Sequence, residues 1–147
     1  MAISTRAQIL KILDHEELVK EFGAFSDQLD SDLASLQQAL SKMPLSNEVP
    51  KLETHMTFVE SWRERVARRL SFVICFLQHA KSHHFLIQKT KFVTADDRTA
   101  FQKSLTAGME SWSVYLEHLI DCIDSRVNEV KKLIGVESEV GGRRLHG

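Results

Sequence analysis

The fold is decided by residues 51–91, which read KLETHMTFVESWRERVARRLSFVICFLQHAKSHHFLIQKTK. Apolar side chains recur there every three or four residues, the spacing that keeps them on one face of an α-helix. The members of this face are Leu52, Met56, Val59, Trp62 or Arg63, Val66, Leu70, Val73, Leu77, Ala80, His84 and Ile87. The pattern predicts a helix roughly 60 Å long with the sustained periodicity of a coiled coil.

Similar apolar stripes lie on both sides of this segment. The expected helices span about residues 5–13, 15–43, 51–91 and 95–134. The first begins at a capping box formed by Thr5 and Gln8. Because the connection near Val93 is short, the last two helices should lie antiparallel. The sequence therefore predicts an all-α fold: a long antiparallel helical hairpin plus a preceding helix, in a coiled-coil-like bundle.

A turn centred near Val93 also predicts which residues of the hairpin face one another. Residues whose numbers sum to about 186 should lie opposite, within one helical turn. This register places Arg65, Arg68 and Arg69 near Asp121, His118 and Glu117, and Glu60 near Arg126.

We expect a single helical domain over residues 1–135, followed by a flexible tail over residues 136–147. Gly135 suits the position just after a helix, where a left-handed backbone is common. The tail contains three of the six glycines and has no apolar periodicity.

Membrane and export signals are not expected. The most apolar run, Leu70 to Leu77, is eight residues long, far short of the roughly 20 needed to span a bilayer. Cys75 and Cys122 have no metal or redox spacing, which favours a reducing compartment. We therefore expect a cytoplasmic protein, in the host cytoplasm if a phage encodes it, with no membrane partner.

The segment Phe72–Leu77 is apolar on most sides of its helix. A helix that is apolar all round is covered all round, so either the first long helix or another subunit must cover it. We expect a homo-oligomer. Its predicted interface consists of Phe72, Ile74, Phe76, Leu77 and Trp112.

Positive charge collects in one part of the chain. Residues 61–103 hold nine Lys and Arg against three Asp and Glu, whereas residues 1–60 hold five against ten. Such a segment can neutralise a phosphate backbone, and an aromatic beside arginine can stack on an unpaired base. The candidate nucleic-acid-binding residues are Trp62, Arg63, Arg65, Arg68, Arg69, Lys81, Lys89, Lys91, Arg98 and Lys103. The alternative is that the arginines form ion pairs within the hairpin.

Catalytic and metal-binding patterns are weak. Two clusters contain side chains that could act as metal ligands or acid–base groups: His79, His83 and His84, and Glu117, Asp121 and Asp124. Neither has the further ligands that a zinc site or a hard-cation site requires. A P-loop, a dinucleotide fingerprint and CxxC are all missing from the sequence. We therefore expect no enzyme activity, no metal, no cofactor and no small-molecule substrate.

The C-terminal helix resembles the final helix of the phage UvsY-type recombination mediators. The residues that carry the resemblance are Trp112, Leu116, Leu119, Ile120, Asp121, Ile123, Asp124, Ser125, Arg126, Val130, Lys131 and Lys132. The resemblance implies a ring-like oligomer that binds single-stranded DNA and helps to load a recombinase. The acidic first long helix departs from a uniformly basic surface.

Two functions follow as hypotheses. The first is a non-catalytic oligomeric protein that binds single-stranded DNA as a recombination or replication accessory. The second is a structural or adaptor protein, such as a virion or complex component, that binds partner helices and no nucleic acid. The charge complementarity between residues 1–60 and 61–103 favours the second.

Overall fold

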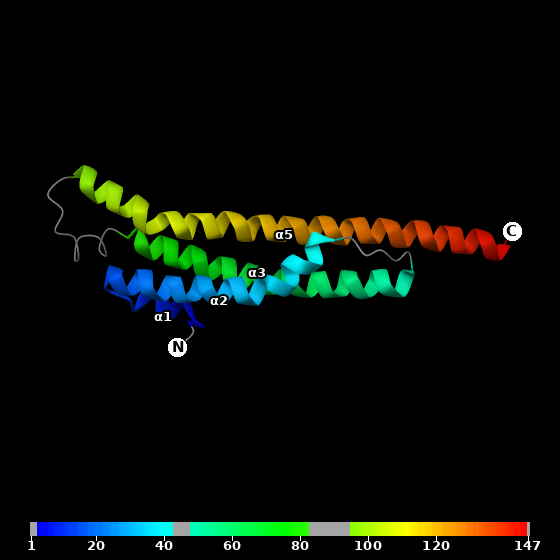
Figure 1. Ribbon diagram of the computed structural model, residues 1–147, viewed down its shortest axis with the longest axis horizontal. Helices are drawn as coiled ribbons and strands as arrows, with labels where there is room; N and C mark the ends of the chain where they lie inside the picture. Colours follow the sequence, from blue (N-terminus) through cyan, green and yellow to red (C-terminus); the bar gives the residue numbers. More distant parts are fainter. Residues whose placement is uncertain (1–2, 43–47, 83–94, 147) are drawn as a thin grey trace. The chain divides into compact units, whose positions relative to one another are not determined.

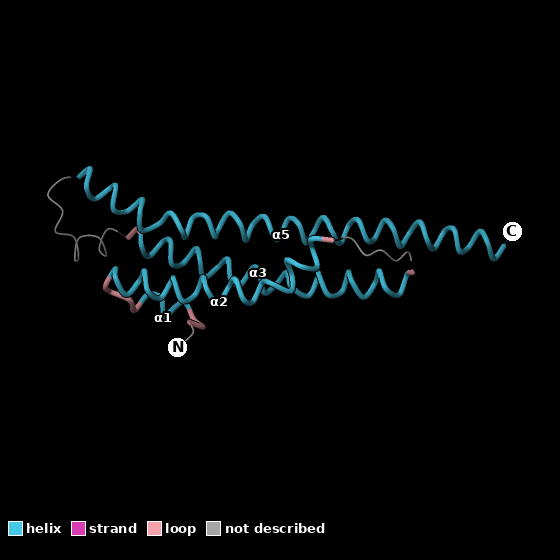
Figure 2. Tube along the Cα trace, viewed as in Figure 1, coloured by secondary structure: helices cyan, strands magenta, loops and turns pink. Residues whose placement is uncertain are grey.

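The computed structural model describes residues 3–42, 48–82 and 95–146; for Arg98 and residues 137–146 it describes the backbone alone. Its helices are α1 (Arg6–Leu10), α2 (His15–Ser41), α3 (Val49–Ala80) and α5 (Ala95–His146) (Figures 1 and 2). Within the described residues no strand occurs. The predicted all-α fold is confirmed.

Helices α3 and α5 pack as the predicted antiparallel hairpin. Arg63 contacts Asp124, whereas Lys81, further along α3, contacts Glu110, which lies earlier in α5. Residue numbers therefore rise along one helix as they fall along the other. The Arg63–Asp124 pair lies one residue from the predicted register.

The helix starts follow their capping residues. Thr5 Oγ1 accepts a hydrogen bond from Gln8 N–H at 3.4 Å, and Gln8 Oε1 accepts one from Thr5 N–H at 3.1 Å, which confirms the capping box. At the start of α2, Asp14 Oδ1 accepts from Glu16 N–H at 2.8 Å. These acceptors satisfy amide groups that have no partner within their own helix.

Two predicted helix ends are wrong. The helix predicted over residues 51–91 ends at Ala80, where Ser82 N–H bonds His79 O at 3.1 Å and tightens the last turn; residues 83–91 lie outside the described part. The tail predicted from Val136 is instead a helix, because α5 continues through Gly135 to His146. A glycine that ends a helix usually takes a positive φ, and no described glycine does.

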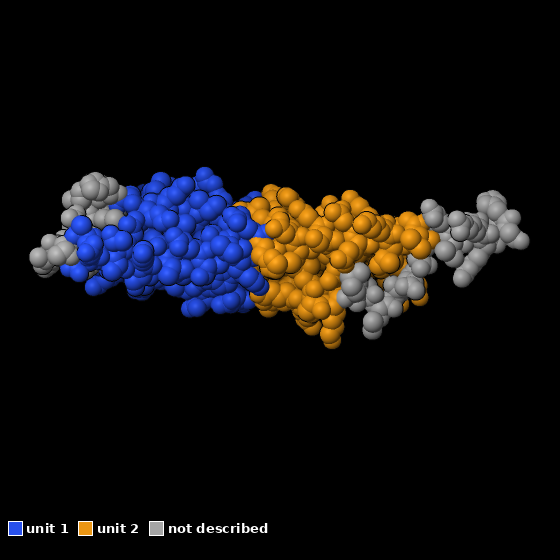
Figure 3. All heavy atoms as spheres, turned by 90° about the horizontal axis from the view of Figure 1, so that it is seen from above, with its two compact units in different colours: residues 1–32, 68–117 blue, residues 33–67, 118–147 orange. Residues whose placement is uncertain are grey.

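The contacts of the chain group into two compact units, and the single predicted domain stays a prediction. Unit 1 comprises residues 1–32 and 68–117, and unit 2 comprises residues 33–67 and 118–147 (Figure 3). Helices α2, α3 and α5 each contribute to both units. An apolar periodicity predicts a helix, but it does not predict at which residue the boundary between the two units falls.

The core of unit 1 is built around phenylalanines. The ring of Phe76 lies 5.3 Å from that of Phe22 and 5.5 Å from that of Phe25, and Phe72 lies 6.2 Å from Phe25. Such edge-on and tilted contacts are the geometries that aromatic pairs prefer. Helix α2 therefore covers the part of α3 that is apolar on most sides.

This packing corrects part of the predicted oligomer interface. Phe76 is 0% exposed and Phe72 is 8% exposed within the single chain, so neither is available to another subunit. Ile74 remains 36% exposed, whereas Leu77 and Trp112 are half-buried. Of the two covers considered, the first long helix is the one observed.

The core of unit 2 is aliphatic. Its buried side chains come from α2, α3 and α5 and are Leu33, Leu36, Leu52, Val59, Val66, Leu119, Ile123, Val127 and Val130. The aromatic residues of α3 in this unit, Phe58 and Trp62, lie outside that core, and Phe58 is 42% exposed.

Candidate nucleic-acid interface

Several of the predicted nucleic-acid-binding cations form ion pairs within the protein, among them Arg63, Arg69 and Lys81. Arg63 and Asp124 make a two-bond contact, with Nε to Oδ1 at 2.9 Å and Nη2 to Oδ2 at 3.3 Å. The hydrogen bond from Arg63, helped by its charge, holds the pKa of Asp124 below its usual value, against the effect of burial. The same bond raises the pKa of Arg63.

The other two internal pairs lie in unit 1. Arg69 Nη2 is 3.3 Å from Asp32 Oδ2 on α2, and its guanidinium lies 6.0 Å from the centre of the Phe25 ring. Lys81 Nζ is 3.2 Å from Glu110 Oε1 on α5. Arg69 therefore forms its ion pair with α2, a partner that the hairpin register did not predict.

The remaining predicted cations divide into two groups. Arg65, Arg68 and Lys103 are described and exposed. Lys89 and Lys91 lie outside the described residues, and the side chain of Arg98 is likewise outside them.

An exposed aromatic–arginine surface runs along α3 in unit 2. The Arg65 guanidinium lies 4.9 Å from the centre of the Trp62 ring, and the Trp62 ring lies 6.5 Å from that of Phe58 at 66°. Spacings of four and three residues bring these side chains onto one face of the helix. We call Phe58, Trp62 and Arg65 the α3 ladder.

Phe58 was missed by the sequence reasoning. It lies off the apolar stripe, and the signal that could have found it is its spacing of four residues before Trp62. It is also the more exposed ring, since Trp62 is half-buried and has Arg65 over it. A shallow, open depression continues from Phe58 toward the start of α3, and its lining is Pro50, Glu53, Thr54, Thr57 and Phe58. All of these belong to α3, so the depression is a helix surface and not an enclosed cleft.

The chemistry of the α3 ladder is stacking. An exposed aromatic ring accepts a nucleobase or another flat apolar group on its face, and a guanidinium plane can stack or bind a phosphate. The ladder has no nucleophile or acid–base pair among its members, so it suits binding.

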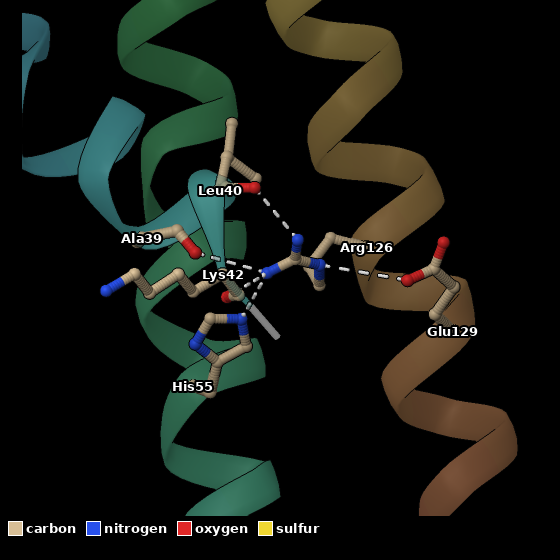
Figure 4. Close-up of polar contacts among 6 residues, drawn as sticks. All are labelled: Ala39, Leu40, Lys42, His55, Arg126 and Glu129. Carbon is tan, nitrogen blue, oxygen red and sulfur yellow. Dashed lines mark hydrogen bonds and ion pairs between the residues drawn. The ribbon is translucent and has the colours of Figure 1, made fainter. Parts of the chain in front are cut away.

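A second polar site in unit 2 surrounds Arg126, which is only 11% exposed as a side chain. Its Nη1 donates to Ala39 O at 3.1 Å and to Lys42 O at 3.0 Å, and its Nη2 donates to Leu40 O at 2.9 Å (Figure 4). Two of these carbonyls lie in the last turn of α2 and the third belongs to Lys42 directly after it. This end of a helix carries partial negative charge and favours a cation. The predicted contact of Arg126 with Glu60 is therefore replaced by a cap on α2.

His55 of α3 completes this site, which we call the Arg126 clasp. Arg126 Nη1 lies 3.1 Å from His55 Nε2. Nη1 has two N–H groups for three acceptors, Ala39 O, Lys42 O and His55 Nε2, so one N–H is shared between two of them. Because a guanidinium only donates hydrogen bonds, Nε2 accepts in this contact, which requires a neutral imidazole with its proton on Nδ1. Burial, followed by the charge of Arg126, lowers the pKa of His55. On the other side of the guanidinium, Glu129 Oε2 is 3.8 Å from Arg126 Nε.

Two of the candidate metal ligands, His79 and Asp124, have other contacts in the described residues. His79 Nε2 lies 2.6 Å from Ile12 O, and Asp124 is paired with Arg63; His83 and His84 lie outside the described part. Among the described residues, no group of three or more His, Cys, Asp or Glu is placed to hold a metal ion. In the same part of the chain, no helix is both long and apolar enough to cross a membrane.

Comparison of the chain with protein-family models, with curated proteins and with solved structures found no match. No relative therefore supplies a function for this chain. The resemblance of its C-terminal helix to the UvsY-type mediators stays a prediction, and functional inference rests on the α3 ladder and on the pairing of the charges.

Proposed function

We propose that the protein is a non-catalytic helical accessory protein that binds single-stranded DNA through the α3 ladder. The supporting observation is the exposed series of Phe58, Trp62 and Arg65, with an arginine stacked on one ring and a second ring 42% exposed. Rings of this kind hold unpaired bases without regard to sequence, because every base has a flat π-face. Bases within a duplex are already stacked, so single strands are the preferred ligand.

Stacking contributes more to this binding than charge does. Arg63, Arg69 and Lys81 make ion pairs within the protein, and an anion would have to compete with Asp124, Asp32 and Glu110 for them. Each phosphate contact to single-stranded DNA contributes about −0.7 to the slope of log affinity against log salt concentration. Because the α3 ladder has one arginine, we expect its affinity for single-stranded DNA to depend only weakly on salt concentration.

The test is fluorescence anisotropy with a labelled oligothymidine at two salt concentrations. Phe58→Ala and Trp62→Ala should each weaken binding, by about 5- to 150-fold if each ring holds one base, since a stacked base contributes roughly 1–3 kcal/mol. Val114→Ala is the control, because it removes an apolar side chain that is 66% exposed on α5. Absence of binding at low salt, or full binding by both ladder variants, would reject the proposal.

The protein acts, in this proposal, as a mediator-like homo-oligomer that helps a recombinase onto the strand. With Phe72 and Phe76 covered by α2, the contacts left for a second copy are Ile74, Leu77 and Trp112. Sedimentation equilibrium at micromolar concentration tests this part. Ile74→Asp should shift the protein toward the 16.8 kDa monomer, and a wild type that sediments as that monomer would remove the oligomer from the proposal.

A second candidate is an adaptor protein that binds a partner helix and no nucleic acid. The observation that favours it is that the charge complementarity of the sequence joins helices of the same chain, as in Arg69 with Asp32. Tryptophan and arginine are also enriched where protein interfaces hold most of their binding energy. A protein that ignores oligothymidine but co-purifies with a partner through Phe58 and Trp62 would belong to this class.

A further inference from the structure

We propose that the Arg126 clasp is an acid-sensitive latch: protonation of His55 releases the C-terminal end of α2 from Arg126. The proposal is independent of what the α3 ladder binds. It rests on the contact between Arg126 Nη1 and His55 Nε2 at 3.1 Å and on the three α2 carbonyls held by the same guanidinium.

The contact works in only one protonation state. Neutral His55 offers a lone pair at Nε2 to the Arg126 N–H. Protonated His55 has an N–H at Nε2, so it can no longer accept a hydrogen bond from Arg126. Its positive charge also repels the positive charge of the guanidinium. Its new N–H also competes with Arg126 for the carbonyl oxygens nearby, of which Lys42 O is bound by the same Nη1 atom.

The charges around His55 do not compensate for this change. Among the described residues, α5 brings Arg126 and Glu129 to the clasp, and the end of α2 brings Lys42. Glu129 is 58% exposed and lies on the opposite side of the guanidinium from His55 (Figure 4). Within α3, one turn before His55, Lys51 is paired with Glu48 at 3.6 Å.

The pH window follows from the direction of the shift. The pKa of His55 in the folded protein is lowered from the ordinary 6.5, so the unfolded chain binds its proton more readily. The clasp therefore contributes its full stability above pH 6.5. That contribution is lost as the pH falls through the lower folded pKa.

The experiment is hydrogen exchange of the full chain, read at the amides of Ala39, Leu40 and Ser41 at about pH 7.5 and about pH 5.5, after correction for intrinsic exchange rates. In the wild type, protection of these amides should be lower at the acidic pH. Because this acidic pH is about one unit below the ordinary 6.5 of histidine, the loss is at most about tenfold, however far folding lowers the pKa of His55.

Two variants separate the latch from a general acid effect. His55→Gln keeps an acceptor that cannot be protonated, so protection should no longer depend on this pH step. His55→Lys places a permanent cation against Arg126, so protection should be low at both pH values. The control is His118→Gln, which removes an exposed histidine of α5 that contacts Cys122. The proposal is overturned if His55→Gln retains the wild-type pH dependence, or if His55→Lys is protected like the wild type.

Discussion

The two units place their aromatic residues in opposite ways. Unit 1 encloses Phe22, Phe25, Phe72 and Phe76 between α2 and α3, whereas unit 2 has an aliphatic core and leaves Phe58 and Trp62 on its surface. Large rings contribute most to stability when they are buried. Apolar surface that stays accessible often marks a place that another molecule covers. The four packed phenylalanines of unit 1 therefore serve the fold, whereas Phe58 and Trp62 of unit 2 are available for binding.

The units also differ in how they hold α2. In unit 1, α2 is held mainly by the ring contacts, with the partly exposed Arg69–Asp32 pair at their edge. In unit 2, the end of α2 is held by the Arg126 clasp. Apolar packing is insensitive to pH and to modest salt, whereas the clasp depends on hydrogen-bond donors. Changes in solution conditions should therefore affect unit 2 before unit 1.

The largest expected effect compares one phenylalanine from each unit. Phe76→Ala should destabilise the protein by about 3–5 kcal/mol, because it leaves a cavity in a core where the ring is 0% exposed. Phe58→Ala removes the same atoms from a ring that is 42% exposed and should change stability by only about 0.5 kcal/mol. Urea denaturation measures both. Equal losses would mean that the ladder belongs to the core.

The next effect concerns the clasp. Arg126→Ala should cost about 1–3 kcal/mol, because carbonyls of α2 lose a donor in a nearly buried site. Arg126→Lys keeps the charge but has only one nitrogen to serve the three carbonyls, so most of the loss should remain. Thermal unfolding of both variants measures this. If lysine restored the full stability, the positive charge at the C-terminal end of α2 would be the stabilising feature, and not the several N–H donors of the guanidinium.

Two helical glycines give a smaller effect of opposite sign. An added Cβ at Gly23 in unit 1 or at Gly135 in unit 2 would have nothing within 4 Å. Each change to alanine should therefore stabilise the protein by about 0.5–1 kcal/mol through the lower flexibility of the unfolded chain. Thermal unfolding is the measurement. A destabilising Gly135→Ala would indicate that the chain leaves the helix there, as the sequence analysis expected.

The smallest effect concerns the exposed Arg63–Asp124 pair. Arg63→Ala should leave the melting temperature nearly unchanged, because both side chains are about half exposed and water screens the pair. The pKa of Asp124 should nevertheless rise toward its ordinary 3.8, since the hydrogen bond that lowers it is gone. Any stability that the pair contributes is present above pH 3.8 and is lost as the pH falls through the lowered value. A carboxyl titration followed by NMR measures the change.

The sequence predicted features that depend on local spacing. Periodicity gave the helices and their buried faces, the capping box at Thr5 was correct, and the hairpin register placed Arg63 within one residue of its partner. Features that depend on a third helix were not predictable. An apolar stripe does not reveal whether α2 or another chain covers Phe76. The spacing of residues along α5 likewise does not predict that Arg126 contacts the end of α2. A glycine such as Gly135 can lie within a helix or directly after its end. The sign of its φ angle distinguishes the two, and the sequence does not give that angle.

The same distinction holds for the candidate site. The proximity of Arg65 to Trp62 follows from their spacing of three residues on one helix. The pairing of Arg69 with Asp32 required knowing which face of α2 meets α3. For this reason the sequence left open whether a given arginine binds a phosphate or forms an ion pair within the protein.

The Arg126 clasp also has a consequence for the order of folding. The carbonyls of Ala39, Leu40 and Lys42 receive their hydrogen bonds from a residue 84 to 87 positions later in the chain. Contacts so distant in sequence require a large loop to close, and they generally form after local structure. In a nascent chain, the last turn of α2 therefore lacks these hydrogen bonds until the segment of α5 that contains Arg126 has been synthesised and has docked.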